Sequence, residues 1–448
     1  MIKPGEDHRD RDSIVVPPGF QLDEDLAAAW HLMEHTHETL FLTGRAGTGK
    51  SSLLNYFRKN TLKKYVVLAP TGLAALQVGG NTIHSFFGFP LRALVKNDPE
   101  IRAWGKGHPR LNIVHKMDVL IIDEVSMVRA DLMDAIDQSL RLNMRNDIPF
   151  GGKQLVLIGD IFQLPPVVTT RENSMYAEDD PYYNPYFFSS DAFRACHPKI
   201  IELKKIYRQH DEDFIYLLNR VRMGIATHDD LCELNKRYDP DESSTGDFAV
   251  TLSSVNAIAD AVNLKKLMEL PHASFTYKAE VDGTFHEHLY PAPPLLKLKE
   301  GAQVMMVRND PHGRWVNGSI GKIVQLTDRA IMVKFADGSS HKVEPTIWDN
   351  KTYTWDKSSN SITFEIQGTY TQYPIKLAWA ITIHKSQGLT FDRIIIDMGK
   401  GAFAHGQLYV ALSRCKTLDG ITLKTMLTAR DMIVDEAVEH FAGKTGIG

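Results

Sequence analysis

The chain has 448 residues and a mass of 50.5 kDa, which corresponds to roughly two to four domains. Hydrophobic residues make up 43% and charged residues 24% of the chain. This ordinary globular composition excludes a wholly disordered, collagen-like or small disulfide-stapled protein. The formal net charge of -4 excludes a surface that is basic throughout, but a local basic groove for nucleic acid is compatible with it.

The cysteines (Cys196, Cys232 and Cys415) lie far apart and form no C-x-x-C pair, which favours reduced thiols and argues against structural zinc. Residues 1–12 are polar and charged, as in a frayed tail, and lack the apolar core of a signal peptide. No apolar run is long enough to span a bilayer. We therefore expect a soluble cytoplasmic protein, nucleoid-associated in a bacterium, without a signal peptide, transmembrane segment or membrane partner.

The first part of the chain alternates between helical and strand-like segments. Apolar positions at helical spacing predict a helix over residues 23–35. A short buried strand at residues 39–43 leads through a glycine-rich loop into a helix over residues 52–58. Further strands are predicted at residues 65–69, 119–122 and 154–158, with a helix over residues 130–145. This alternation is typical of a parallel, doubly wound α/β sheet.

The same pattern returns later in the chain and predicts a second α/β domain, without a glycine-rich phosphate loop of its own. Its strands are expected at residues 199–203, 249–252, 377–382 and 393–397, and its helices at residues 213–223 and 255–270. Between its two halves, residues 302–345 contain short strands joined by glycine turns, which predict a small inserted β-barrel. Residues 89–114 are interpreted as a smaller insertion in the first domain.

Residues 44–51 (GRAGTGKS) fit the phosphate-loop pattern G-x-x-x-x-G-K-S, between a predicted strand and a predicted helix. The backbone N–H groups of this loop are predicted to wrap the phosphates of a nucleotide, with the helix N-terminus adding positive potential. The cradle residues are Gly44, Ala46, Gly47, Thr48 and Gly49. Lys50 would bridge the β- and γ-phosphates, and the Ser51 hydroxyl would bind Mg²⁺. The alternative is a chance glycine turn.

Two polar segments follow the third and fourth predicted strands. Asp123 is expected to orient the magnesium ion, and Glu124 to polarise the attacking water as general base. Gln163 lies in residues 159–167 (GDIFQLPPV), and its amide can sense the γ-phosphate or position water, because it donates and accepts at once. The alternatives are a solvated acid at a strand end for Glu124 and a structural proline turn for Gln163.

Two arginines are candidates for stabilising charge on a transferring phosphoryl group, a role that suits the planar guanidinium. Arg208 follows the predicted strand at residues 199–203, and Arg414 ends the segment YVALSR. Both are assigned to the second α/β domain. The nucleotide would then lie in a cleft between the domains, and closing that cleft can convert hydrolysis into motion. The alternative for both arginines is surface salt bridging.

The motifs and their order resemble superfamily 1B helicases, most closely the petite-integration-frequency (Pif) family, over nearly the whole chain, from about Phe20 to Leu427. The most family-like stretch is residues 149–166, and residues 126–145 resemble the family's signature segment. Other matching segments are residues 69–72 (APTG) and 82–86 (TIHSF), which resemble single-strand DNA-contacting motifs, 383–388 (IHKSQG), which resembles the motif linking DNA to the ATP site, and 409–414, the last helicase motif.

The resemblance implies an α/β fold with two RecA-like parallel-sheet P-loop NTPase domains. They would cover residues 1–190, and residues 191–270 with 371–448, with a small wedge insertion at about 89–114 and an SH3-like β-barrel at 271–370. It supports the ATP-site roles of Lys50, Ser51, Asp123, Glu124, Gln163, Arg208 and Arg414, and it places Gly388 near the γ-phosphate. Residues expected along or near the DNA channel are Thr71, Gly72, His84, Phe86, His384 and Lys385.

The implied function is that of an ATP-dependent 5′-to-3′ DNA helicase, monomeric in solution, which translocates on single-stranded DNA and unwinds duplex in genome maintenance. No residue selects visibly among forked, RNA–DNA and G-quadruplex substrates. The family often has a glutamine at the start of the N-terminal helix that reads adenine, whereas here Gln21 is out of register. Two other readings are an RNA helicase of the same superfamily and a nucleotide-switched binding module with slow hydrolysis.

Single strands are usually held by cationic grooves and aromatic faces, and each stacked base contributes about 1–3 kcal/mol. Candidate stacking residues are Phe86, Phe87, Phe89, Trp104, Trp315 and His384. The alternative for Phe86 and Phe87 is a place in the core. Trp315 lies in a glycine-rich turn between Arg314 and Asn317, and we expect its ring to be exposed.

Overall fold

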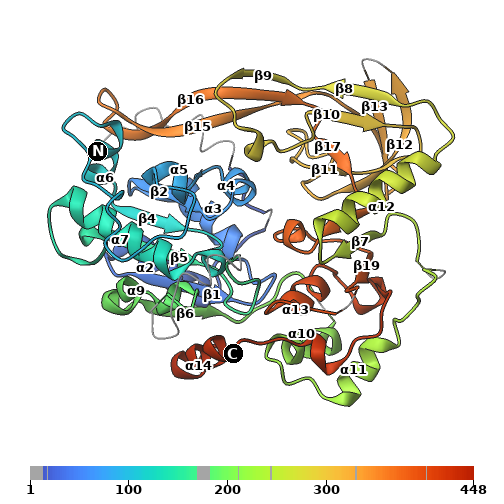
Figure 1. Cartoon of the computed structure of the whole chain (residues 1–448), viewed down its shortest axis with the longest axis horizontal. Helices are drawn as coiled ribbons and strands as arrows, with labels where there is room; N and C mark the ends of the chain where they lie inside the picture. Colours follow the sequence, from blue (N-terminus) through green and yellow to red (C-terminus); the bar gives the residue numbers. More distant parts are fainter. Residues whose placement is uncertain are drawn as a thin grey trace.

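The computed structural model describes residues 14–17, 19–168, 182–209, 211–242, 245–327, 330–399 and 401–448. The tail at residues 1–12, which we expected to be frayed, lies outside these ranges. Within the described ranges, no helix combines the length and the apolar character that crossing a membrane would need. Two α/β domains lie side by side, and a β-rich unit next to the second domain sends a long hairpin over the first (Figure 1).

The first domain is built on a six-stranded parallel sheet with the order β3-β2-β4-β5-β1-β6. The strands are β1 (Leu40–Gly44), β2 (Tyr65–Ala69), β3 (Asn81–Thr82), β4 (Val119–Ile122), β5 (Gln154–Ile158) and β6 (Lys199–Leu203). The α-helices around them are α2 (Glu24–His35), α3 (Lys50–Asn60), α4 (Gly72–Val78), α5 (Ile83–Phe87), α6 (Pro109–Lys116), α7 (Ala130–Met144) and α9 (Asp191–Cys196). Both faces of the sheet pack into apolar clusters, which explains the continuous apolar sequences of β1, β4 and β5.

The position of β6 corrects the predicted domain boundary. We expected this strand to open the second sheet, but it pairs in parallel with β1, from Leu40 opposite Lys199 to Gly44 opposite Leu203. The first sheet therefore extends beyond residue 190. The prediction failed because a short apolar strand carries no local signal that says which of two sheets it joins.

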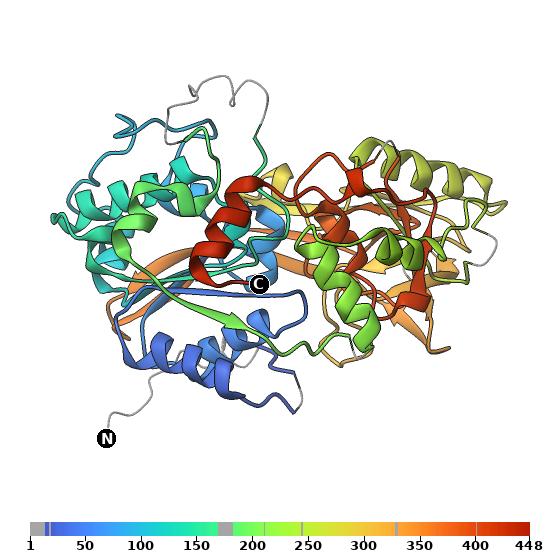
Figure 2. The same ribbon diagram turned by 90° about the horizontal axis from the view of Figure 1, so that it is seen from below.

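The second domain has a four-stranded parallel sheet with the order β18-β7-β19-β20. Its strands are β7 (Val250–Ser253), β18 (Ala380–Thr382), β19 (Ile394–Asp397) and β20 (Ile421–Leu423). The α-helices of this half of the chain are α10 (Glu212–Arg222), α11 (His228–Asn235), α12 (Asn256–Glu269), α13 (Gln407–Leu412) and α14 (Glu436–Thr445). Figure 2 shows α14 lying over the first domain, where Phe441 stacks on Phe188 with ring centroids 4.3 Å apart. All cysteines of the chain are free, as predicted.

The inserted β-rich unit is confirmed. A five-stranded sheet has the order β14-β13-β12-β11-β17. Its strands are β11 (Gln303–Met306), β12 (Ile320–Thr327), β13 (Ala330–Phe335), β14 (Ser340–Val343) and β17 (Ile375–Leu377). The single strand predicted at residues 377–382 is wrong, because the chain leaves the insertion through β17 and enters the second domain through β18. Smaller sheets contain β8 (Phe275–Lys278), β9 (Glu280–Gly283) and β10 (Leu295–Leu298).

A long antiparallel hairpin of β15 (Thr346–Asp356) and β16 (Ser361–Gln372) reaches from the insertion over the first domain (Figure 1). The Tyr353 hydroxyl accepts from the Val67 N–H of β2 at 2.9 Å and donates to the Val67 carbonyl at 3.3 Å. Asn81 Nδ2 donates to the Lys351 carbonyl at 2.7 Å. Since β3 has only two residues, the hairpin satisfies the backbone of β2 where strand pairing ends.

We expect Tyr353→Phe to lower the free energy of unfolding by about 1–3 kcal/mol, because it leaves the buried amide of Val67 without its partner. Urea unfolding of the full chain measures the change. Tyr216→Phe is the matched control, since the Tyr216 side chain is 56% exposed. Equal stability of the wild type and Tyr353→Phe would contradict the capping role of the hydroxyl.

Candidate active site

A cavity of about 1040 Å³ lies between the two α/β domains. The first domain contributes residues 46–52, the N-terminal segment 19–23, Glu124 and Gln163 to its wall. The second domain contributes Gly388, Thr390, Arg414, Lys416 and Thr417. Segments that are distant in sequence thus meet at the point where β1 ends, as expected for a ligand site at the carboxyl edge of a parallel sheet.

The phosphate loop, residues 44–51, has the backbone of an anion cradle. Gly47 and Gly49 have φ angles of 82° and 90°, which favour glycine. A Cβ at Gly47 would also lie 2.5 Å from the Cβ of Arg208. Helix α3 starts at Lys50, and in the described structure Gly49 offers no capping side chain, so the first N–H groups of the helix remain available to an anion. Gly44 lies behind the cradle as the last residue of β1.

Lys50 lies folded back on its own loop. Its Nζ donates to the carbonyl oxygens of Gly44 at 2.5 Å and Arg45 at 2.9 Å. Burial lowers the pKa of Lys50, while Asp160 and Glu124 act in the opposite direction. A triphosphate would offer this ammonium group a stronger partner than two carbonyl oxygens.

Asp123 and Glu124 form a buried acid pair after β4. Burial and the neighbouring Glu124 raise the pKa of Asp123 to about 7. Burial also raises the pKa of Glu124, against the opposing effect of Lys50 and Arg414. The backbone of Glu124 is left-handed, with a φ angle of 52°. Glu124 lines the cavity, whereas the neighbouring Asp123 is buried. The nearby cations offset the burial of these carboxyl groups only in part, since both pKa values remain raised, and this favours binding of a further cation.

The oxygen donors at this place fit a magnesium ion. Ser51 lines the cavity and offers a hydroxyl, and Asp123 offers a carboxylate. No group of three or more metal-ligating side chains is found in the part of the chain that the structure describes. Magnesium is usually held by one or two protein oxygens and completed by phosphate oxygens and water, so two donors suffice.

Arg208 and Arg414 both line the cavity. Burial and the neighbouring Arg208 lower the pKa of Arg414 to about 9. The Arg414 guanidinium donates through Nε to the Val410 carbonyl at 2.9 Å and through Nη2 to the Ser413 hydroxyl at 2.7 Å. Burial excludes the surface salt bridge for Arg414. The structure shows a cavity between the two domains, with Arg414 on the wall that the second domain provides.

The assignment of Arg208 to the second domain is wrong. Arg208 follows β6, the last strand of the first sheet, and packs against Gly47 of the phosphate loop. Its Nη1 donates across the cleft to the Ser413 carbonyl at 3.3 Å. The two guanidinium groups therefore approach the site from both walls, and Arg414 is the one that comes from the second domain.

Gln163 belongs to a chain of hydrogen bonds that links the two domains and that no sequence motif indicates. Its Nε2 donates to Asp160 Oδ2 at 3.3 Å, and the Tyr409 hydroxyl donates to the same oxygen at 3.4 Å. The Ala46 N–H donates to the Tyr409 hydroxyl at 2.9 Å. Helix α13 of the second domain thus contacts the phosphate loop directly through Tyr409, the first residue of the motif YVALSR.

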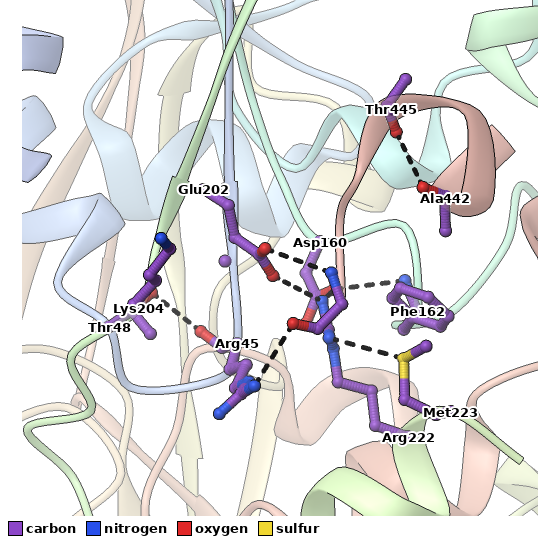
Figure 3. A network of polar contacts seen from close by, with 12 residues as sticks. Arg45, Thr48, Asp160, Phe162, Glu202, Lys204, Arg222, Met223, Ala442 and Thr445 are labelled. Atoms are coloured by element: carbon purple, nitrogen blue, oxygen red, sulfur yellow. Dashed lines mark hydrogen bonds and ion pairs between the residues drawn. The ribbon is translucent and has the colours of Figure 1, made fainter. Parts of the chain in front are cut away.

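Arg222 joins the domains from the other side of Asp160 (Figure 3). Its Nη2 lies 3.2 Å from Asp160 Oδ1 and 3.6 Å from Glu202 Oε1, and its guanidinium lies 4.2 Å from the Phe162 ring centroid. The side chain is 1% exposed. The sequence could have predicted that Arg222 is buried. It follows Phe214 and Leu218 at helical spacing and therefore lies on the buried face of α10.

One helix with candidate DNA residues in the first domain lies next to the candidate DNA segment of the second domain. Thr71 caps α4, with its hydroxyl accepting from the Ala74 N–H at 3.2 Å, and Gly72 begins the helix. On the same helix, Gln77 Oε1 lies 3.3 Å from the position of a Cβ at Gly388. Helix α4 is therefore next to the segment that carries His384 and Lys385. Burial lowers the pKa of both His84 and His384, and Lys385 is exposed.

Four of the predicted base-stacking residues are buried, and the structure does not support their stacking on bases: Phe86, Phe87, Phe89 and Trp315. Phe86 is 4% exposed and packs edge-on against Phe87 and Tyr353, which fits its alternative reading as a core residue. The expected exposure of Trp315 is wrong. Its side chain is 7% exposed, lies parallel to Phe335 at 5.8 Å and is covered by the Arg314 guanidinium at 4.5 Å. Glycine-rich surroundings did not reveal that the ring belongs to the core of the insertion.

Gln21, which the sequence analysis placed out of register, lies on the cavity wall together with Phe20, Leu22 and Asp23. The Tyr207 hydroxyl donates to Asp23 Oδ2 at 2.7 Å, and the Tyr207 N–H donates to the Gly47 carbonyl at 2.9 Å. These contacts tie the start of α2 to the phosphate loop. An amide side chain is therefore available in the cavity even though the sequence pattern is shifted.

A phosphate loop, an acid pair and arginines on both walls of a cleft define a P-loop nucleotide-binding protein with two RecA-like domains. Comparison with known families agrees with this class. The PIF1-like helicase model matches residues 26–230, the UvrD-like helicase C-terminal domain matches residues 377–418, and the DNA helicase Pif1 2B domain matches residues 288–326.

Among curated proteins, ATP-dependent DNA helicase Pif1 of Bdellovibrio bacteriovorus is 32% identical over 434 residues, which cover 94% of this chain and 92% of that protein. ATP-dependent DNA helicase PIF1 of Homo sapiens is 34% identical over 419 residues, which cover 90% of this chain and 60% of that protein. The chain thus spans less than two thirds of the vertebrate relatives' length. The chain belongs to the Pif1 helicase family.

Solved structures agree with this family. The structure of Bacteroides sp Pif1 in complex with ADP-AlF4 has a TM-score of 0.87 and 38% identity, covering 95% of this chain and 97% of that one. Bacteroides Pif1 bound to ssDNA has a TM-score of 0.68 at 38% identity, covering 95% and 97%. The α/β architecture with two parallel sheets and inserted β-rich unit is therefore the fold of this family.

We expect Arg222→Met to lower the free energy of unfolding by about 3–5 kcal/mol, because Asp160 and Glu202 lose the buried guanidinium that they share. Combining it with Asp160→Asn should recover a large part of the loss. Chemical denaturation of both variants measures this, with Lys59→Met, an exposed change on α3, as the control. A double variant as unstable as the single one would contradict the ion pair as the cause.

Proposed function

We propose that this chain is an ATP-dependent DNA helicase that moves 5′ to 3′ along single-stranded DNA and unwinds duplex. The observation that carries the proposal is the cavity whose wall includes Lys50 of the first domain and Arg414 of the second. Such a cavity makes nucleotide binding depend on how the domains are arranged, and hydrolysis can then change that arrangement. The names of the similar helicases support the same activity.

In this proposal each residue of the cleft has a separate role in phosphoryl transfer. The phosphates lie against the N–H groups of the phosphate loop, and Lys50 leaves the carbonyls of Gly44 and Arg45 for the β- and γ-phosphates. Glu124 takes a proton from the attacking water, and Gln163 orients that water. A magnesium ion held by Ser51 and Asp123 would neutralise phosphate charge.

Arg414 stabilises the charge that develops on the γ-phosphate, with Arg208 beside it. Once the γ-phosphate leaves, the two guanidinium groups lose their shared anionic partner, and their mutual repulsion favours separation of the walls. Tyr409 and Arg222 transmit this movement, since each joins a helix of the second domain to the first domain. Gln21 is our candidate for contacting the base of the nucleotide.

We propose that the single strand runs past Thr71, Gly72 and His84 of the first domain and His384 and Lys385 of the second. The proximity of α4 to the segment with Gly388 supports one continuous track. The 5′-to-3′ polarity, action on forked, RNA–DNA or G-quadruplex structures, and a role in replication, repair, recombination and telomere-type maintenance follow from the family resemblance. A solved Pif1 structure is described as unwinding at forked dsDNA by two coordinating helicases. We propose a monomer in solution, working on DNA in the cytoplasm or nucleoid.

We expect the wild type to unwind a duplex with a 5′ single-stranded tail in the presence of ATP and Mg²⁺ and to leave a 3′-tailed duplex intact. Lys50→Ala should reduce single-strand-stimulated ATP hydrolysis by at least about 100-fold, because the β- and γ-phosphates lose their cation. A strand-displacement assay and a phosphate-release assay measure the two effects. Lys59→Ala, an exposed change on the same helix, is the control.

Different outcomes separate the competing readings. Unwinding of only the 3′-tailed duplex would reject the polarity. Stronger stimulation of ATP hydrolysis by RNA than by DNA would favour an RNA helicase. Slow hydrolysis with every nucleic acid would favour a nucleotide-switched binding module. Normal hydrolysis in Lys50→Ala would reject the proposed mechanism itself.

A further inference from the structure

A second cavity, of about 350 Å³, lies between the second domain and the β-rich insertion. It is formed by α12, β10, β17, β18 and the residues that follow β18. The wall residues that carry polar side chains are Asn256, Asp260, Asn263, Lys297, Lys376, Thr382 and Lys385. None of the ATP-site residues described above lines it, so it needs its own explanation.

The charge on this wall is unbalanced. Its titratable groups are Asp260 on α12, Lys297 on β10, Lys376 on β17 and Lys385 after β18. Three ammonium groups therefore face one carboxylate. Burial, reinforced by the neighbouring Lys385, lowers the pKa of Lys376 to about 8. In the ranges that the structure describes, Lys376 Nζ has no hydrogen-bond or ion-pair partner.

A partly buried ammonium without a partner is unfavourable in an empty protein. The surrounding fold adds positive potential instead of removing it, because the first turn of the 14-residue helix α12 reaches the cavity at Asn256. No side-chain cap covers the N–H groups of that turn within the described structure. Two lysines and a helix N-terminus thus converge on a space that would hold a single phosphate group with its neighbouring sugar.

We propose that this cavity is a phosphate-binding subsite in which Lys376 and Lys385 hold one backbone phosphate of the single strand. The inference rests on the proposed function and adds a residue, Lys376, that no motif identified. Inorganic phosphate has the same chemistry and is the other source of such an anion. The strand is favoured because Lys385 belongs to the segment IHKSQG, which also carries Gly388.

That segment connects the two cavities. Thr382 and Lys385 line the phosphate subsite, and Gly388 and Thr390 line the cavity between the domains. A phosphate that draws Lys385 toward Lys376 acts on a backbone only three residues from Gly388. Occupancy of the subsite is thereby coupled to the geometry of the nucleotide cleft, which gives the strand a direct way to stimulate hydrolysis.

The test measures binding of the full chain to a dye-labelled oligodeoxycytidylate by fluorescence anisotropy over a series of salt concentrations. Lys376→Gln should weaken binding about 5- to 10-fold near neutral pH and reduce the slope of log K against log salt by about 0.7, the value for one lost phosphate contact on a single strand. Lys265→Gln, an exposed change on α12 outside the cavity, should leave both quantities unchanged.

The pH dependence gives a second readout. Phosphate stabilises the charged form of Lys376, so binding takes up a proton once the pH exceeds the pKa of about 8 in the free protein. Wild-type affinity should therefore fall from about pH 7 to about pH 9 by a larger factor than the affinity of Lys376→Gln. Lys297→Gln and Asp260→Asn establish how far the other groups on the wall contribute.

Inorganic phosphate distinguishes the two sources. If it raises the Tm of the wild type but not of Lys376→Gln, while both bind the oligonucleotide equally, the subsite takes free phosphate and not the strand. Unchanged affinity, salt slope and phosphate response in Lys376→Gln would overturn the subsite. A wild type that binds no oligonucleotide would instead reject the proposed function, and the phosphate response would still test the subsite.

Discussion

The site depends on pairs of like charges that are buried next to each other in the cleft. Burial and Arg208 lower the pKa of Arg414 to about 9, and burial and Glu124 raise the pKa of Asp123 to about 7. Like charges are therefore held together in the cleft at the expense of stability. In the proposed function, a triphosphate with its metal ion would complement both groups at once, and binding would then favour closure of the cleft. The same buried charges would then serve both ATP hydrolysis and the closure of the cleft.

The contacts around this cleft determine how a change there reaches the rest of the molecule. Tyr409 joins α13 to the phosphate loop, and Arg222 joins α10 to Asp160 and Glu202. The segment from Thr382 to Thr390 touches both the nucleotide cavity and the lysine-lined cavity. These connections are side-chain contacts between sheets and helices. In the proposed function, they would convert a small shift at the γ-phosphate into a rigid-body movement of a domain.

Much of this was available from the sequence. The phosphate loop, the acid pair and Gln163 were identified because their residue types and their positions after apolar strands carry the chemistry locally, and β2, β4 and β5 have the predicted bounds. The predictions that were wrong concern features that tertiary structure decides. The sheet that β6 joins is decided by the path of the chain, which also decides on which wall Arg208 lies.

Other features were missed for the same reason. The hairpin of β15 and β16 has no motif, and its function is to cap β2 from a distant part of the chain. Trp315 has turn-like neighbours but packs on Phe335. Arg222 could have been found, because an arginine on the apolar face of an amphipathic helix signals a buried partner. Lys376 could not have been found from the sequence, because its proposed role depends on the folded chain bringing it near Lys385.

The central claim is that the second domain completes the catalytic site through a planar guanidinium. The most direct measurement is ATP hydrolysis by Arg414→Lys, which keeps the charge and removes the planar fork, alongside binding of a fluorescent nucleotide. The account predicts nucleotide affinity close to that of the wild type and a kcat lower by about 100- to 1,000-fold. Hydrolysis at the wild-type rate in a folded, nucleotide-binding Arg414→Lys protein would contradict it.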